Sequence, residues 1–159
     1  MIGFLTYILC IRHTRMMLFY FSLALIEKCR HDLTKKEEYF AQVRINQEYI
    51  HEYMVHSPIN FAMYWTLVEA ELIGFTGSPS AILQASRLYE DALNQAREGD
   101  WYFELSVIHE YTGAFYYRAG YQNIAYCLVK KVLLIVRYIM PPINFTDTFF
   151  IIYVYIYIS

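Results

Sequence analysis

The sequence lacks the features that define several common classes of protein. Its three cysteines are widely spaced and odd in number, so they fit neither a CxxC metal site nor a disulfide framework, and they favour a reducing, cytoplasmic compartment. They are Cys10, Cys29 and Cys127. The 13 Lys and Arg residues nearly balance the 15 Asp and Glu residues, and a net charge of −2 provides no basic surface for a phosphate backbone or an anionic membrane. We therefore expect no nucleic-acid partner.

Motifs for catalysis and cofactor binding are also missing. No glycine-rich phosphate-binding loop and no nucleophile elbow occurs in the sequence. His51 and His56 are five residues apart, whereas two zinc-binding histidines on one helical face are four apart. His109-Glu110 is similar to the phosphoacceptor box of histidine kinases, but the residues after it, 111–113, lack the proline of that box. The sequence predicts no catalytic residue, no metal and no cofactor, and hence a chain that is not itself an enzyme.

No hydrophobic run is long enough to span a bilayer. Residues 1–11 are apolar but end at Arg12, about half of the roughly 20 residues that a spanning helix needs. We expect residues 4–30 to form a buried or partly buried helix, with an interfacial membrane anchor as the less favoured alternative. Residues 149–159 are uncharged and rich in β-branched and aromatic side chains, which is typical of an aggregation-prone segment. Oligomerisation or aggregation through these apolar ends stays open.

The chain length fits one ordinary domain, which we place at residues 1–140, with residues 141–159 as an irregular apolar tail. No alternating strand pattern with hairpin turns precedes the tail, so the predicted class is all-α, with short connections and antiparallel neighbouring helices. The predicted helices cover about residues 4–30, 34–56, 59–75, 79–97, 101–118 and 121–139.

Helix boundaries are predicted from local signals. A capping box at Thr34–Glu37 would start the second helix. Proline suits a first helical turn, glycine permits a helix end, and serine or aspartate caps the next start. The residues that we assign to these roles are Pro58, Gly77, Ser78, Pro79, Gly99, Asp100 and Gly120.

A small–aromatic–small pattern lies on the helix predicted at 79–97. Ala85, Tyr89 and Ala92 are spaced four and three apart, so they share one face on which a neighbouring helix can pack closely. This pattern is typical of the second helix of a tetratricopeptide-type (TPR-like) hairpin. A second, degraded copy of the repeat follows. Gly113 and Tyr116 have the spacing of the first helix of such a hairpin, and Ala125 lies where the next small residue should fall. We therefore predict stacked TPR-like hairpins with these six residues in their packing faces, and an ordinary helical bundle is the alternative.

Tyrosines are dense near the end of the predicted helical region. Tyr111, Tyr117, Tyr121 and Tyr126 provide more rings than one buried stripe absorbs. Tyrosine combines a large apolar ring with a polar hydroxyl, which suits a protein interface. These four residues are candidates for binding a partner, and core packing is the alternative.

Several segments between residues 18 and 131 resemble the helical-repeat region of large, mostly fungal signalling proteins. The segments that carry the resemblance are SPINF at 57–61, LVEAE at 67–71 and LYEDA at 88–92, followed by Glu110 and Tyr116. Proteins of this family join a kinase-like domain, a predicted ATPase of the STAND or AAA kind, the helical tract, a sensor domain and often a hybrid histidine kinase. The sequence departs from the family after Lys131, and the kinase, P-loop and phosphoacceptor regions are missing.

The resemblance implies a cytoplasmic, non-catalytic interaction or regulatory module that takes part in signal transduction. Its expected partner is a protein, either a signalling partner or another domain of such a kinase. Two alternatives stay open. One is a fragment of an ATP-dependent sensor kinase in a phosphorelay, whose catalytic domains lie elsewhere. The other is a membrane-peripheral helical protein.

Overall fold

The structure, a computed structural model, describes residues 2–139 and, among these, the side chains of residues 14, 16–135 and 138. This part of the chain consists of helices joined by short connections and contains no strand, so the predicted all-α class is confirmed for it. Residues 140–159, which include the whole of the predicted apolar tail, lie outside the described residues. The elements are α1 (Ile2–His31), the 3-10 helix η1 (Leu33–Lys35), α2 (Lys36–His56), α3 (Pro58–Gly74), α4 (Pro79–Glu98), α5 (Tyr102–Arg118) and α6 (Gln122–Ile139).

The chain divides into two units. The first ends at Gln95 and contains α1, α2, α3 and most of α4, and the second begins at Ala96 and contains α5 and α6. The single helical domain predicted over residues 1–140 stays a prediction.

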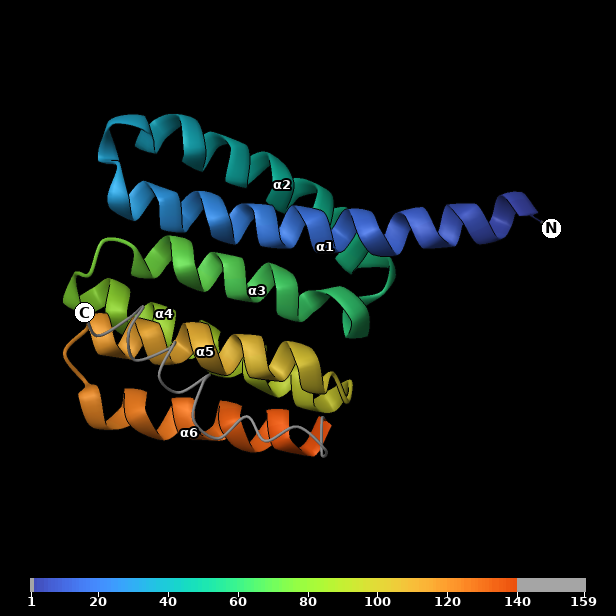
Figure 1. Cartoon of the computed structure of the whole chain (residues 1–159). Coiled ribbons are helices and arrows are strands. Elements are labelled where there is room, and N and C mark those ends of the chain that lie inside the picture. Colours follow the sequence, from blue (N-terminus) through green and yellow to red (C-terminus); the bar gives the residue numbers. More distant parts are fainter. Residues whose placement is uncertain (1, 140–159) are drawn as a thin grey trace. The chain divides into compact units, whose positions relative to one another are not determined.

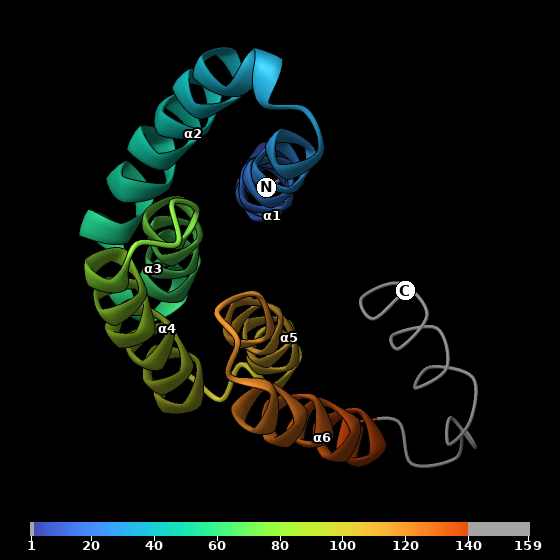
Figure 2. The same ribbon diagram turned by 90° about the vertical axis from the view of Figure 1, so that its left-hand side faces the viewer.

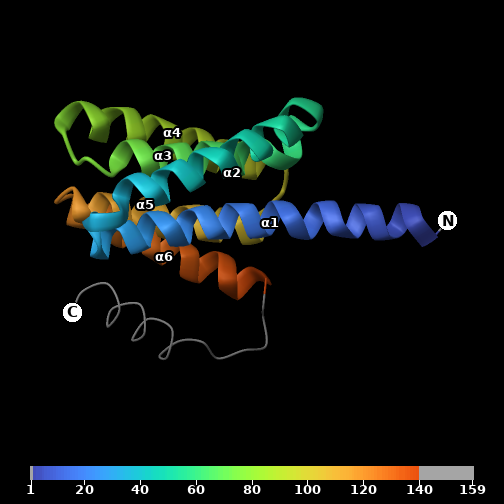
Figure 3. The ribbon, with the colours of Figure 1, turned by 90° about the horizontal axis from the view of Figure 1, so that it is seen from above.

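Three helices of the first unit, α1, α2 and α3, lie side by side (Figure 1). Ser57 alone separates α2 from α3, and its amide donates to the Tyr53 carbonyl while its own carbonyl accepts from the Asn60 amide. The first turns of α1 extend past the ends of α2 and α3 (Figure 3). Apolar side chains of all three helices form the core, and Phe19 packs its ring edge-on against Tyr64 at 4.7 Å between centroids.

Buried amides also join these helices. The Asn46 side chain donates to the Ser22 hydroxyl at 3.0 Å and so connects α2 to α1. The Gln47 side chain donates to the Trp65 carbonyl and to the Glu69 carboxylate, both at 3.0 Å, and connects α2 to α3. A buried polar group without a partner costs about 1–3 kcal/mol, so these hydrogen bonds offset the cost of burying the two side-chain NH2 groups.

Most of the predicted helix starts and ends are present. Pro58 is the first residue of α3 and Pro79 is the first residue of α4, as expected from the fixed φ of proline. Gly77 has a φ of 66°, in the left-handed region, between α3 and α4. The Ser78 hydroxyl accepts from the Ala81 amide at 3.3 Å, which confirms the predicted cap of α4.

The predicted capping box at Thr34–Glu37 is wrong. Asp32 caps the short η1 instead, and its carboxylate accepts both the amide and the hydroxyl of Thr34, at 3.0 and 2.5 Å. With its hydroxyl turned back to Asp32, Thr34 does not cap α2. That helix begins at Lys36, after Lys35, which makes no side-chain capping bond. The Thr34 hydroxyl therefore bonds to a carboxylate two residues upstream and does not form the expected cap.

The connection between α4 and α5 also differs from the prediction. Asp100, and not Gly99, takes the positive φ, at 55°. The residue that caps α5 is Trp101, without a side-chain bond, while the Asp100 carboxylate accepts from the Tyr102 hydroxyl at 3.2 Å. Aspartate is one of the few residues that enters the left-handed region at low cost, so it replaces glycine here.

The second unit is built on the α5–α6 hairpin, whose two helices lie side by side (Figure 2). Gly120 has a φ of 87° in the turn that joins them, as predicted for the end of α5. Gly113 faces α6, and a Cβ atom at this position would lie 3.4 Å from a Val129 methyl carbon and 3.6 Å from the Ala125 carbonyl oxygen. The small residue thus marks the place where α5 and α6 pack closely.

Candidate functional site

The small–aromatic–small set of α4 is buried in the structure. Ala85, Tyr89 and Ala92 have no accessible surface. Their spacing places all three on one side of the helix, and the amphipathic pattern of α4 keeps polar side chains on the other side. Their assignment to a TPR-like repeat stays a prediction.

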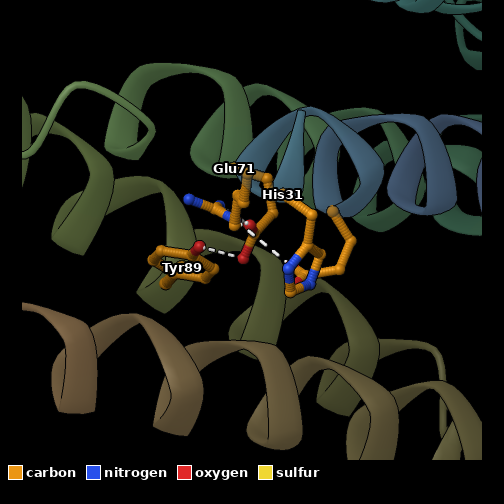
Figure 4. Close-up of polar contacts among 5 residues, drawn as sticks. His31, Glu71 and Tyr89 are labelled. Atoms are coloured by element: carbon orange, nitrogen blue, oxygen red, sulfur yellow. Dashed lines mark hydrogen bonds and ion pairs between the residues drawn. The ribbon is translucent and has the colours of Figure 1, made fainter. Parts of the chain in front are cut away.

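Glu71 is the centre of a polar group that the sequence did not indicate. Its side chain is 1% exposed, and its two carboxylate oxygens accept from different helices. The Tyr89 hydroxyl of α4 donates to Oε1 (Figure 4), and Arg30 Nη2 of α1 lies 2.5 Å from Oε2. One carboxylate of α3 therefore holds both α1 and α4.

Arg30, which pairs with Glu71, has further neighbours. Arg30 Nε lies 3.2 Å from a Glu27 carboxylate oxygen, and the guanidinium lies 5.1 Å from the centre of the Phe75 ring. His31 pairs with the same Glu27 carboxylate at 3.5 Å. Both oxygens of the Glu71 carboxylate accept hydrogen bonds, one from Arg30 and one from the Tyr89 hydroxyl. The buried carboxylate therefore links helices.

The second packing set lies in the α5–α6 hairpin. Gly113 and Ala125 are buried, whereas Tyr116 is half-buried. The Tyr116 ring contacts Phe115 and Tyr121 edge-on, with centroids 5.2 and 6.1 Å apart. Tyr116 therefore packs at the margin of the hairpin, beside its connecting turn.

Three of the four tyrosines predicted to bind a partner are exposed. Tyr117 is 39% exposed, Tyr121 is 50% exposed and Tyr126 is 61% exposed, whereas Tyr111 is half-buried. The three exposed residues lie within ten positions of the chain at the connected ends of α5 and α6, and we call them the tyrosine surface. Exposed rings at one end of a rigid hairpin are suited to contact another protein.

His109 is a buried residue of α5 whose Nδ1 atom makes no hydrogen bond. Burial, together with the positive charges of Lys131 and Arg97, lowers the pKa of its imidazole from 6.5 to about 4. Burial raises the pKa of the neighbouring Glu110. His109 is therefore neutral at pH 7 and packed inside the unit, out of reach of a phosphoryl donor.

The described residues contain no cluster of metal-ligating side chains. No three His, Cys, Asp or Glu side chains come together there as they would around a metal ion, and His51 and His56 are both exposed. No helix of this part of the chain has the length and apolar character needed to cross a bilayer.

Comparisons of the chain with protein-family models, with curated proteins and with solved structures gave no match.

Proposed function

We propose that the chain is a non-catalytic helical module that binds a protein partner through the tyrosine surface. The exposure of Tyr117, Tyr121 and Tyr126 on one hairpin supports this proposal. Tyrosine and tryptophan often carry a large share of the binding energy of a protein interface, because they lose little conformational entropy and bury a large area. The hairpin provides a packed base for these rings, since Gly113 and Ala125 are buried between α5 and α6.

We further propose that the helices are TPR-like hairpins of a signalling protein, as the resemblance to fungal kinase-associated regions implies. The burial of Ala85, Tyr89 and Ala92 supports the repeat pattern. A cytoplasmic location fits the free thiols of Cys29 and Cys127, the second of which is exposed, because an oxidising compartment favours paired cysteines.

The experiment uses the immobilised full-length chain to capture proteins from cells of the organism that encodes it. Captured proteins are quantified by mass spectrometry for the wild-type chain and for a Tyr121→Ser/Tyr126→Ser double variant. We expect the double variant to lose at least one partner by about tenfold, which corresponds to about 1.4 kcal/mol of binding energy. Its helix content and melting midpoint by circular dichroism should stay close to those of the wild type.

The matched control is Tyr49→Ser, which removes a tyrosine of similar exposure from α2 in the first unit. Capture should be unchanged in this variant. Equal capture by the wild-type chain and the double variant would show that the tyrosine surface does not bind the partner.

A further inference from the structure

α6 carries a second apolar stripe that its hairpin does not use. Ala125 and Leu128 are buried on the face toward α5. A different face exposes five residues, which we call the α6 seam: Ile124, Cys127, Lys131, Leu134 and Tyr138. Ile124 is 45% exposed, Leu134 is 57% exposed and Tyr138 is 75% exposed.

The spacing of the α6 seam fits another helix. Its members follow one another at intervals of three, four, three and four residues, which is the repeat of side chains that meet between two packed helices. An extended segment would instead need alternate residues on one face. The seam ends in an aromatic pair, since the Tyr138 ring lies 5.8 Å from that of Tyr102.

The charge of α6 selects the kind of helix. Its sequence contains Lys130, Lys131 and Arg137 and no acidic residue. Lys131 stands in the middle of the seam, so a docked helix must place a carboxylate near its ammonium group or leave that charge desolvated and unpaired. An antiparallel second copy centred on Lys131 would oppose two ammonium groups, which disfavours a symmetric dimer at this surface.

We propose that the α6 seam binds an amphipathic helix of another protein that carries acidic residues beside its apolar stripe. This inference rests on the proposed function and names its partner class, but it uses a different surface from the tyrosine surface. Apolar contacts to Leu134 and Tyr138 provide most of the affinity, and Lys131 provides the charge preference.

The probe is a pair of synthetic helical peptides of about 18 residues, the length of α6. Both carry leucine at seam spacing, and the flanking positions are glutamate in one peptide and lysine in the other. Binding to the full-length chain is measured by fluorescence anisotropy. We expect the acidic peptide to bind at least about tenfold more tightly than the basic one, and this ratio should shrink as salt is raised.

Two variants locate the site. Leu134→Ser should weaken binding of the acidic peptide by about tenfold or more, and Lys131→Glu should reverse the preference so that the basic peptide binds more tightly. Lys35→Glu makes the same change in net charge on the first unit and should leave the preference unchanged. The Tyr121→Ser/Tyr126→Ser variant should bind the acidic peptide like the wild type, which separates this proposal from the tyrosine surface.

Three outcomes would overturn the inference. The first is equal affinity of the two peptides, or no effect of Leu134→Ser. The second is a dimer of the free chain that Leu134→Ser dissociates, because the occupant would then be a second copy. The third is a tenfold gain in peptide affinity when Ile152→Asp is introduced, because the chain's own C-terminal segment would then occupy the α6 seam.

Discussion

Glu71 shows how much of the first unit depends on a single side chain. Its carboxylate accepts from Arg30 and from Tyr89, which lie 41 and 18 positions away in the sequence. In the sequence, Glu71 looks like an ordinary helical glutamate, because no local pattern indicates partners so far away along the chain. The structure therefore identifies a link that sequence reasoning could not reach.

Removal of this carboxylate should be costly. Glu71→Ala leaves the Arg30 guanidinium, which is mostly buried, without its closest counter-charge, and we expect the free energy of unfolding to fall by about 3 kcal/mol. Tyr89→Phe removes one hydrogen bond and should cost about 1–2 kcal/mol. Urea denaturation measures both changes. Glu90→Ala on the exposed side of α4 is the control and should stay within about 0.5 kcal/mol of the wild type, and a similar loss in all three variants would argue against the link.

His109 should make stability depend on pH. Its folded pKa of about 4 lies below the ordinary value of 6.5, so the unfolded chain binds the proton more readily. Its contribution to stability is complete above about pH 6.5 and is lost as the pH falls toward 4, to a total of about 3 kcal/mol. Urea denaturation at several pH values measures the slope. His109→Gln should flatten it between pH 6.5 and 4, and an unchanged slope would mean that other groups cause the dependence.

The elements of the fold follow closely from local sequence signals. Pro58, Gly77, Ser78 and Gly120 mark helix boundaries that the structure contains, because proline, glycine and serine act on the backbone within a few residues. Thr34 does not cap α2, because its hydroxyl donates to the Asp32 carboxylate instead. Local signals thus predict where helices begin and end, but not which of several neighbouring polar groups will bond.

Two glycines of the second unit should respond in opposite ways to alanine. Gly113 lies in a helix, and a Cβ atom there would make contacts of 3.4 Å or more, so Gly113→Ala should raise the free energy of unfolding by about 0.5–1 kcal/mol. Gly120 has open space around it but a φ of 87°, so Gly120→Ala should lower that free energy by about 1 kcal/mol. Thermal or urea denaturation of the two variants provides the comparison. A loss of stability in Gly113→Ala as well would show that α6 leaves no room for a Cβ atom at position 113.

The division between the two units falls inside α4, between Gln95 and Ala96. No proline or glycine lies at this point, so a search for breaks in the sequence does not find it. The distribution of long-range contacts sets the division, and residue pairs far apart in the sequence determine that distribution. Sequence reasoning therefore predicts the helices better than it predicts their grouping.

The charge balance predicts when the chain will associate with itself. With a net charge of −2 and a pI of about 6.2, electrostatic repulsion between molecules is weakest near pH 6. We expect light scattering of the full chain to be highest near pH 6 and to fall at pH 8, where the molecule becomes more negative. Scattering that stays constant from pH 6 to pH 8 would show that exposed apolar groups dominate self-association.

The connection between α2 and α3 is a single residue, Ser57, and has no spare length. If α2 moves, no flexible segment takes up the movement, so the first turn of α3 must move with it. The four residues at positions 75–78, between α3 and α4, offer the opposite behaviour and can take up added length. Chain-length changes at position 57 should therefore disturb the whole first unit, whereas the same changes near Gly77 should remain local.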